Sequence, residues 1–206
     1  MTLLGIDCAT EACSVALFAE ARLVAGDYRV MGRGHAEALV PMIAALPGNG
    51  RADRIVVSLG PGSFTGLRVG LAAARALGLS WDVPVLGYPT LALIAAMARK
   101  QQGAQPVAVV TTGGHGEWFM AEYDAAGTEL TPPVSVTPES AAASTRANLV
   151  AGSQAEAMVA VRGTGTALAM LPDAREIIVL DEAYWREDLT LIYGRAPDAR
   201  LPGPRP

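Results

Sequence analysis

The stretch SLGPGSFTGLRVGLAAARAL, residues 58–77, puts three glycines and a proline between a short apolar strand and a long alanine-rich helix. A loop between a strand's carboxyl end and a helix N-terminus presents unpaired N–H groups that bind anions well. A Walker A loop, however, requires a lysine after its last glycine, and a leucine and an arginine follow Gly66. Gly60, Gly62 and Gly66 also miss the dinucleotide fingerprint by one position. The spacing therefore gives a phosphate site only weak support.

The same loop can instead hold the helix at a fixed angle to the sheet. Glycines let the strand turn sharply, and a serine at the start of a helix caps its free N–H groups. We predict this positioning role for Gly60, Pro61, Gly62, Ser63, Thr65 and Gly66. Phosphate contact is then not required.

The helix after the loop carries a continuous seam of residues spaced by three and four. The seam comprises Phe64, Leu67, Leu71, Ala74 and Gly78, and a neighbouring face of small side chains comprises Gly66, Gly70, Ala73, Ala74 and Leu77. One interpretation is that one side of the helix covers the chain's own sheet and the rest faces water. The other is that a second face meets a helix of another chain. The second interpretation predicts a partner interface made of Phe64, Leu67, Arg68, Gly70, Leu71, Ala74, Arg75 and Gly78.

Apolar patterning predicts a meander of three strands followed by alternating strands and helices. We expect strands at 2–7, 14–19, 21–30, 54–59 and 83–88, and helices at 35–46, 64–79 and 90–100, the last with Thr90 as its N-cap. This order predicts a mixed sheet with helices packed on it.

A change of composition at 100–105 predicts a hinge between a first lobe, 1–100, and a smaller second lobe, 101–195. The proline-rich end, 196–206, is expected to be a mobile tail. In the second lobe we expect strands at 106–112, 117–124, 148–153 and 176–181, a turn-rich segment at 127–133 and a helix at 154–163.

Composition excludes several classes of protein. Hydrophobic residues make up 51% of the chain and charged ones 17%, which indicates a folded protein. The net charge of −4 disfavours direct binding of nucleic acid, and no apolar run is long enough to span a membrane. The N-terminus also lacks a basic signal-peptide region, so we expect a cytoplasmic protein. Cys8 and Cys13 are expected to be reduced core residues.

The sequence contains few residues that could bind a metal or serve in nucleophilic catalysis. His35 and His115 are the only histidines and lie far apart, so we expect neither a metal nor another cofactor. A peptidase would need Ser63 or Ser14 paired with His35, and no neighbouring residue in the sequence would orient that histidine.

Six segments occur in an order typical of one family: LLGIDCATEACSVALF, GHAEALVP, GPGSFTGLRVGLAAARALGL, VPVLGYPTLALIA, GEWFMAEYD and IYGRAPDA. They resemble the bacterial TsaB (YeaZ) subunits of the tRNA threonylcarbamoyladenosine (t6A) machinery, most strongly over residues 3–99. The resemblance implies an α/β, actin-like and Hsp70-like (ASKHA) fold. Such a fold has mixed sheets, flanking helices and two lobes, the second of them reduced.

The resemblance also implies a non-catalytic dimerisation or scaffold subunit. Such subunits pair with a TsaD-type catalytic subunit through first-lobe helices, and the pair recruits a TsaE-type ATPase. The catalytic paralogue holds a metal through an H-x-x-x-H helix motif, which this sequence lacks. A chain without its partner could form a homodimer through the same exposed helix. The alternative function is a stand-alone ATP-binding phosphotransferase or a peptidase of the actin-like class.

The first hairpin raises the question of a nucleotide. Asp7, Thr10 and Ser14 stand where actin-like folds contact a nucleotide phosphate, so the resemblance implies a vestigial nucleotide site. Asp7 and Thr10 could equally cap the turn by bonding to nearby backbone. In the second lobe, segment 111–119 departs from the family's usual pattern.

Overall fold

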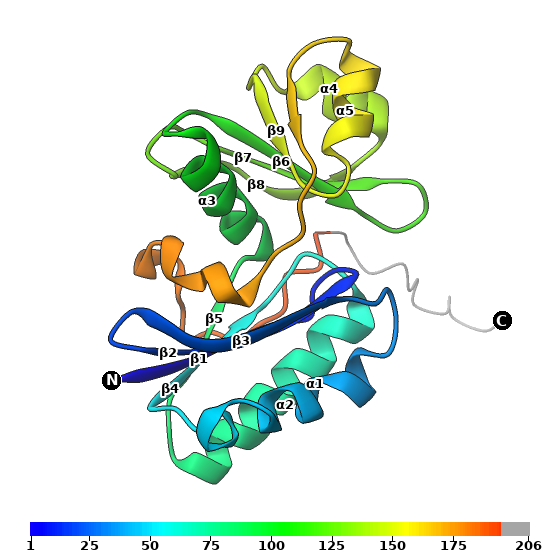
Figure 1. The fold of residues 1–206 in the computed structure, drawn as a ribbon. Coiled ribbons are helices and arrows are strands. Elements are labelled where there is room, and N and C mark those ends of the chain that lie inside the picture. The colour runs from blue at the N-terminus through cyan, green and yellow to red at the C-terminus, as the bar shows by residue number, and fades with distance from the viewer. Residues whose placement is uncertain (195–206) are drawn as a thin grey trace, which may run out of the picture.

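A computed structural model describes residues 1–194, which form two five-stranded sheets with helices on their faces (Figure 1). The first sheet contains β1 (Thr2–Asp7), β2 (Ala12–Ala19), β3 (Arg22–Val30), β4 (Arg54–Ser58) and β5 (Val85–Tyr88). The second contains β6 (Val107–Thr112), β7 (Trp118–Tyr123), β8 (Glu129–Val136), β9 (Leu149–Ala151) and β10 (Thr166–Leu168). This arrangement confirms the predicted class of mixed sheets with flanking helices.

The first sheet has the strand order β3-β2-β1-β4-β5. Strands β1, β2 and β3 form the expected antiparallel meander, and Asp7 pairs with Ser14 where the first hairpin begins. Strands β4 and β5 then run parallel to β1. The carboxyl ends of β1 and β4 therefore lie side by side, which brings the first hairpin turn close to the glycine-rich loop.

Two helices cover the outer face of the first sheet: α1 (His35–Ala44) and α2 (Phe64–Trp81), with the 3-10 turn η1 (Pro47–Gly50) after α1 (Figure 1). The core beneath them includes Leu4, Ile6 and Val57 from the strands. Cys8 and Cys13 belong to the same core, where both thiols are buried and free, as expected. Burial of this apolar face stabilises the lobe and fixes both helices on the sheet.

The second sheet has the order β10-β9-β6-β7-β8. Its outer face is covered by α4 (Pro138–Ser144) and α5 (Ala155–Arg162), which lie at the top of Figure 1. Segment 127–133 was expected to be a turn, but most of it belongs to β8, which includes Pro132 and Pro133. β8 is an edge strand, where a proline can face away from the ladder without leaving a partner unbonded.

Helix α3 (Thr90–Gln102) lies between the two sheets, and Thr90 to Ala98 are all buried. It packs on β6, β7 and β9 of the second sheet. This helix, expected in the first lobe, thus contacts strands of the second. One apolar core, which includes Leu3, Ile94 and Val109, therefore runs from sheet to sheet through α3.

The C-terminal part of the described chain returns to the first lobe. The 3-10 helices η2 (Ala174–Val179) and η3 (Glu182–Tyr184) follow β10, and η2 contacts β1, β2 and β3. The N–H of Ala174 donates to Oγ of Ser14, and the Arg186 backbone pairs with Gly87 of β5. The expected second lobe, 101–195, thus has its last part on the first sheet.

The strand expected at 176–181 is a wrong prediction, because η2 occupies most of that segment. Asp173 caps this helix, since its side chain accepts the N–H of Arg175. The tail expected at 196–206 lies outside the described residues. None of the helices within residues 1–194 combines the length and the apolar character that crossing a membrane requires.

Candidate functional site

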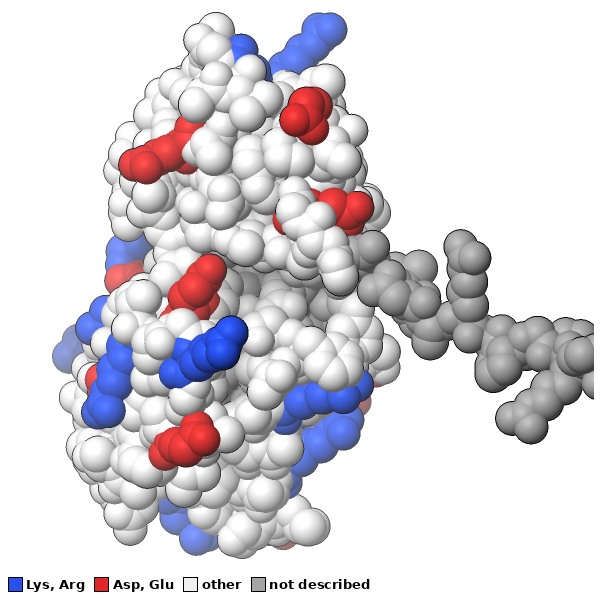
Figure 2. All heavy atoms as spheres, turned by 90° about the vertical axis from the view of Figure 1, so that its right-hand side faces the viewer, with Lys and Arg blue, Asp and Glu red and all other residues white. Residues whose placement is uncertain are grey.

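A cleft of about 680 Å³ opens between the two lobes. The β1–β2 turn (9–11) and the start of α2 line it from the first lobe. The β6–β7 turn and Ser153 line it from the second. Figure 2 views the molecule from this side, with the hollow between the two halves and most of the Lys and Arg side chains on the lower half. Two hairpin turns, one from each sheet, therefore face each other across the cleft.

The glycine-rich loop is held against the first hairpin turn by backbone contacts. The N–H of Ser63 donates to the carbonyl oxygen of Ala9 at 2.7 Å. A Cβ on Gly62 would overlap that same oxygen, and a Cβ on Gly66 would overlap the carbonyl oxygen of Cys8. Only glycine lets the two backbones come this close. These glycines therefore serve packing between loop and hairpin.

The loop also fixes both helices that follow it. Ser63 is the N-cap of α2, and its Oγ accepts the N–H of Gly66 at 3.2 Å. The N–H of Gly60 donates to Oγ1 of Thr90 at 3.1 Å, at the start of α3. Ser63 and Gly60 thus bond to the starts of α2 and α3, where the sequence analysis places a positioning role. Thr90 was expected to cap its own helix, but Pro89 is the N-cap and the Thr90 hydroxyl is used by the loop.

Asp7 lies beneath the cleft and is fully buried. Its Oδ1 accepts the N–H of Ala9 at 2.9 Å, and its Oδ2 accepts the hydroxyl of Tyr88 at 2.7 Å. Burial raises the pKa of the Asp7 carboxyl to about 6, although these hydrogen bonds oppose the shift. The side chain is not among those that line the cleft, so it supports the hairpin from below.

The three residues expected at a vestigial nucleotide site are separated by the fold. Thr10 lines the cleft, and its Oγ1 accepts the N–H of Ala12. Ser14 is buried, where its hydroxyl accepts the N–H of Ala174. Asp7 and Thr10 therefore cap the turn, the alternative left open by the sequence, and only Thr10 faces the cleft.

His35 is buried beside the same hairpin. Its Nε2 lies 2.9 Å from the carbonyl oxygen of Thr10 and 3.2 Å from that of Ala12. Carbonyl oxygens only accept, so Nε2 carries the proton and donates to them. Among the hydrogen bonds of residues 1–194, none joins His35 to Ser14 or Ser63. The pairings considered for a peptidase are therefore not formed.

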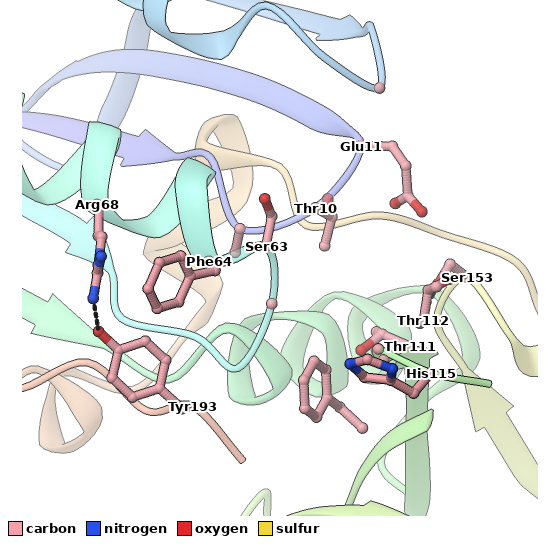
Figure 3. Close-up of a pocket in the computed structure, with 16 residues that line it drawn as sticks. Thr10, Glu11, Ser63, Phe64, Arg68, Thr111, Thr112, His115, Ser153 and Tyr193 are labelled. Carbon is pink, nitrogen blue, oxygen red and sulfur yellow. Dashed lines mark hydrogen bonds between the residues drawn. The ribbon is translucent and has the colours of Figure 1, made fainter. Parts of the chain in front are cut away.

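One end of the cleft is closed by an aromatic pair and an arginine (Figure 3). The rings of Phe64 and Tyr193 are 5.7 Å apart. The Arg68 guanidinium lies 3.5 Å from the centre of the Phe64 ring, and its Nη2 donates to the Tyr193 hydroxyl at 3.4 Å. A cation over an aromatic face is electrostatically favourable. Sequence reasoning missed Tyr193, because no local spacing connects it to a helix more than a hundred residues earlier.

The other end of the cleft is polar. Oγ of Ser153 accepts the N–H of Thr112 at 3.0 Å, and Gln154 donates to the Thr112 hydroxyl at 2.9 Å. Figure 3 shows Glu11 and His115 on this side, across the cleft from Arg68. Thr112 and His115 belong to segment 111–119, which departs from the family pattern and here forms one wall of the cleft.

The seam predicted on α2 proves to face the chain's own sheet. Five of the eight predicted interface residues are buried in the first lobe: Leu67, Gly70, Leu71, Ala74 and Gly78. Val57 and Val85 of the sheet lie against Gly70 and Gly78. A buried residue offers no surface, so the assignment of these five to a partner interface is corrected. Phe64, Arg68 and Arg75 are exposed.

The opposite face of α2 is exposed and rich in small side chains. Ala72, Ala76 and Leu79 follow one another at spacings of four and three, and Leu79 is 87% exposed. Helix α1 packs beside α2 and exposes Val40 and Ala44. We call the surface formed by Ala36, Val40, Ala44, Ala72, Ala76 and Leu79 the outer helical face. No group of three or more metal-ligating side chains is found in the described part of the chain.

Two mixed sheets with flanking helices around a central cleft define an actin-like, ASKHA-type fold. The model of the family described as TsaD, tRNA N6-adenosine threonylcarbamoyltransferase, matches residues 29–180. The chain is 30% identical to YeaZ from Pseudomonas aeruginosa, with a TM-score of 0.74 over 87% of this chain and 89% of that one. The chain belongs to this family, and within it resembles the TsaB and YeaZ members.

Two further relatives bear on the function. The tRNA threonylcarbamoyladenosine biosynthesis protein TsaB of Escherichia coli is 36% identical over 128 residues, which are 60% of this chain and 55% of that protein. The chain thus spans about half the length of the curated relatives it matches. A Pseudomonas aeruginosa protein described as similar to peptidase YEAZ is 31% identical, with a TM-score of 0.72 over 87% of this chain and 89% of that one. EutJ of Carboxydothermus hydrogenoformans, at 13% identity and a TM-score of 0.54 over 88% of this chain and 90% of that one, shares the fold alone.

Proposed function

We propose that this chain is a non-catalytic subunit of t6A biosynthesis, which pairs with a TsaD-type catalytic subunit and supports its transfer reaction. The TsaB-named relatives and the match to the TsaD family model support this role. The observation that carries the proposal is the outer helical face. It is the exposed side of two helices whose other sides are already committed to the chain's own core.

The outer helical face suits close packing of helices. Alanines at positions 72 and 76 leave the α2 backbone accessible, and a partner helix can approach such a surface to within the usual packing distance. Leu79 and Val40 supply apolar area that water would otherwise cover. Arg68 and Arg75 lie on the same exposed side of α2 and can pair with acidic groups at the rim.

The proposal extends to two further partners. The pair formed with the catalytic subunit recruits a TsaE-type ATPase, as the family resemblance implies. A chain without its catalytic partner pairs with a second copy of itself, because the same apolar face is then uncovered. Contact with tRNA belongs to the catalytic partner, since the net charge of −4 disfavours phosphate binding by this chain.

A peptidase or a stand-alone phosphotransferase is the less favoured function. His35 donates its Nε2 proton to backbone carbonyls, and the Ser63 hydroxyl accepts the N–H of Gly66 as an N-cap. Asp7 and Ser14 are buried out of the cleft. These side chains have structural partners, which leaves them poorly placed to act on a substrate.

Reconstitution tests the proposal. The catalytic subunit from the same cell, its ATPase, a threonylcarbamoyl donor and unmodified tRNA are mixed with and without this chain, and t6A is measured by mass spectrometry of nucleosides. We expect t6A only when this chain and the catalytic subunit are both present. Formation of t6A by this chain alone, or an undiminished rate without it, contradicts the proposal.

A further inference from the structure

A second cavity, of about 530 Å³, lies away from the interlobe cleft. It runs between one face of α3, the β7–β8 turn at 126–128, and the segment 178–184 that contains η3. Figure 1 shows η2 and η3, in orange, beside α3 at the junction of the two lobes. We call this cavity the α3 groove. None of the site residues described above lines it.

The floor of the α3 groove is one face of α3. Ala92, Ala95, Ala96 and Arg99 are spaced by three, one and three positions, so they lie together on the helix. The alanine side chains end at Cβ and leave room above the helix. The hydroxyl of Tyr184 donates to the carbonyl oxygen of Gly127 at 2.7 Å and so joins the two walls.

Arg99 is the unusual residue of this groove. Its Nε atom is buried and has no hydrogen-bond partner in the described chain. Its guanidinium packs against Gly127, where a Cβ would overlap Nη1. No hydrogen bond or ion pair with a described carboxylate engages it, whereas the next residue, Lys100, pairs with Glu176. Because no described carboxylate neutralises this guanidinium, its charge remains available to an anion that enters the groove.

We propose that the α3 groove binds the terminal carboxylate or phosphate group of a small molecule, with Arg99 as the anion-binding residue. The planar guanidinium presents parallel N–H groups that match two oxygens of such an anion. Ala95 and Ala96 provide an apolar floor for the rest of the ligand. Of the described residues lining the groove, Asp181 alone carries a carboxylate, and its Oδ1 accepts the N–H of Ala183. Asp181 disfavours ligands that carry a second anionic group away from the one that Arg99 binds.

Side-chain NMR of the full chain labelled with ¹⁵N tests this site. Inorganic phosphate and propionate are titrated separately at constant ionic strength, and the arginine Nε–H resonances are followed. We expect one of these resonances to shift saturably with at least one probe, and to be missing from the spectrum of Arg99→Met. A response to one probe alone identifies the oxyanion that the groove takes, and a response to both shows that it accepts either.

Variants separate the groove from general charge effects. Arg99→Met should weaken binding of the responding probe at least tenfold, and Arg99→Lys should weaken it several-fold because the paired N–H geometry is lost. Lys100→Met removes the neighbouring cation and should leave affinity unchanged. Melting curves establish whether each variant is folded. If Arg99→Met does not fold, Arg99→Lys is used as the test variant. The proposal is overturned if neither probe binds saturably, or if the Arg99 and Lys100 variants lose affinity equally.

Discussion

The hydroxyl of Tyr88, at the end of β5, donates a hydrogen bond of 2.7 Å to the carboxylate of Asp7, at the end of β1. This contact joins two strands that are not adjacent in the sheet, since β4 lies between them. It also places a buried carboxylate directly beneath the hairpin turn of the cleft. Burial raises the pKa of Asp7 to about 6, so its protonation is linked to stability.

The Asp7→Asn variant should gain stability relative to the wild type as pH rises from about 4 to 7. The folded carboxyl has a pKa of about 6, against 3.8 for an aspartate exposed to water, so the folded state binds the proton more tightly between those two pH values. Deprotonation on raising the pH therefore destabilises the wild type, by on the order of 3 kcal/mol for such a shift. Urea unfolding at several pH values measures the difference between the two proteins.

The Tyr88→Phe variant provides the control for that titration. Its hydroxyl donates to the ionised carboxylate, so its removal should raise the pKa of Asp7 further and extend the pH-dependent loss of stability above pH 6. A wild type and an Asp7→Asn variant whose stabilities change in parallel between pH 4 and 7 would exclude the raised pKa.

Gly66→Ala should destabilise the chain by roughly 1–3 kcal/mol, because a Cβ there overlaps the carbonyl oxygen of Cys8 and forces loop and hairpin apart. Gly70→Ala, one turn later in α2, is the matched substitution. Its Cβ would sit 3.5 Å from the Cβ of Cys8, an ordinary contact, and alanine favours a helix by about 1 kcal/mol over glycine. Gly70→Ala should thus be neutral or stabilising, and equal losses at both positions would contradict the close approach.

Leu67→Ala should lower the free energy of unfolding of the isolated chain by about 2–5 kcal/mol, because Leu67 lies on the inner side of α2 and is fully buried. Leu79→Ala on the same helix removes a side chain that is 87% exposed and should change it by less than about 0.5 kcal/mol. Denaturant melts of the two variants compare the faces of α2 directly. Were Leu67→Ala as mild as Leu79→Ala, the inward orientation of the seam would be wrong.

The seam on α2, which faces the chain's own sheet and not a partner, shows what helical periodicity can establish. Spacings of three and four identified an apolar face on α2 that includes Leu67 and Leu71, and that face exists. Periodicity does not say which surface covers an apolar face. A sheet of the same chain and a helix of another chain both require apolar residues at the same spacing. The parallel pairing of β4 with β1 decides the matter, and it is a long-range contact.

Other parts of the fold divide in the same way. The capping role of Ser63 was predictable, since capping depends on neighbours within one turn. The 3-10 helix at Ala174–Val179 was not, because its start is held by a hydrogen bond to Ser14, far away in sequence. The pairing of Phe64 with Tyr193 at one end of the cleft is equally non-local. Local sequence signals thus predicted the loop and most strands. The residues that line the cleft could be identified only once both lobes were placed together.

The outer helical face gives the most direct test of the central claim. Affinity for the TsaD-type catalytic subunit is measured by calorimetry for the wild type, Ala76→Glu and Val161→Glu. Ala76 lies on the outer helical face, whereas Val161 is an exposed apolar residue of α5 in the second lobe. We expect Ala76→Glu to weaken binding at least tenfold, about 1.4 kcal/mol, because the interface would bury an unpaired charge. Val161→Glu should bind like the wild type. Unchanged affinity of Ala76→Glu, or a wild type that does not bind the catalytic subunit, would contradict the account.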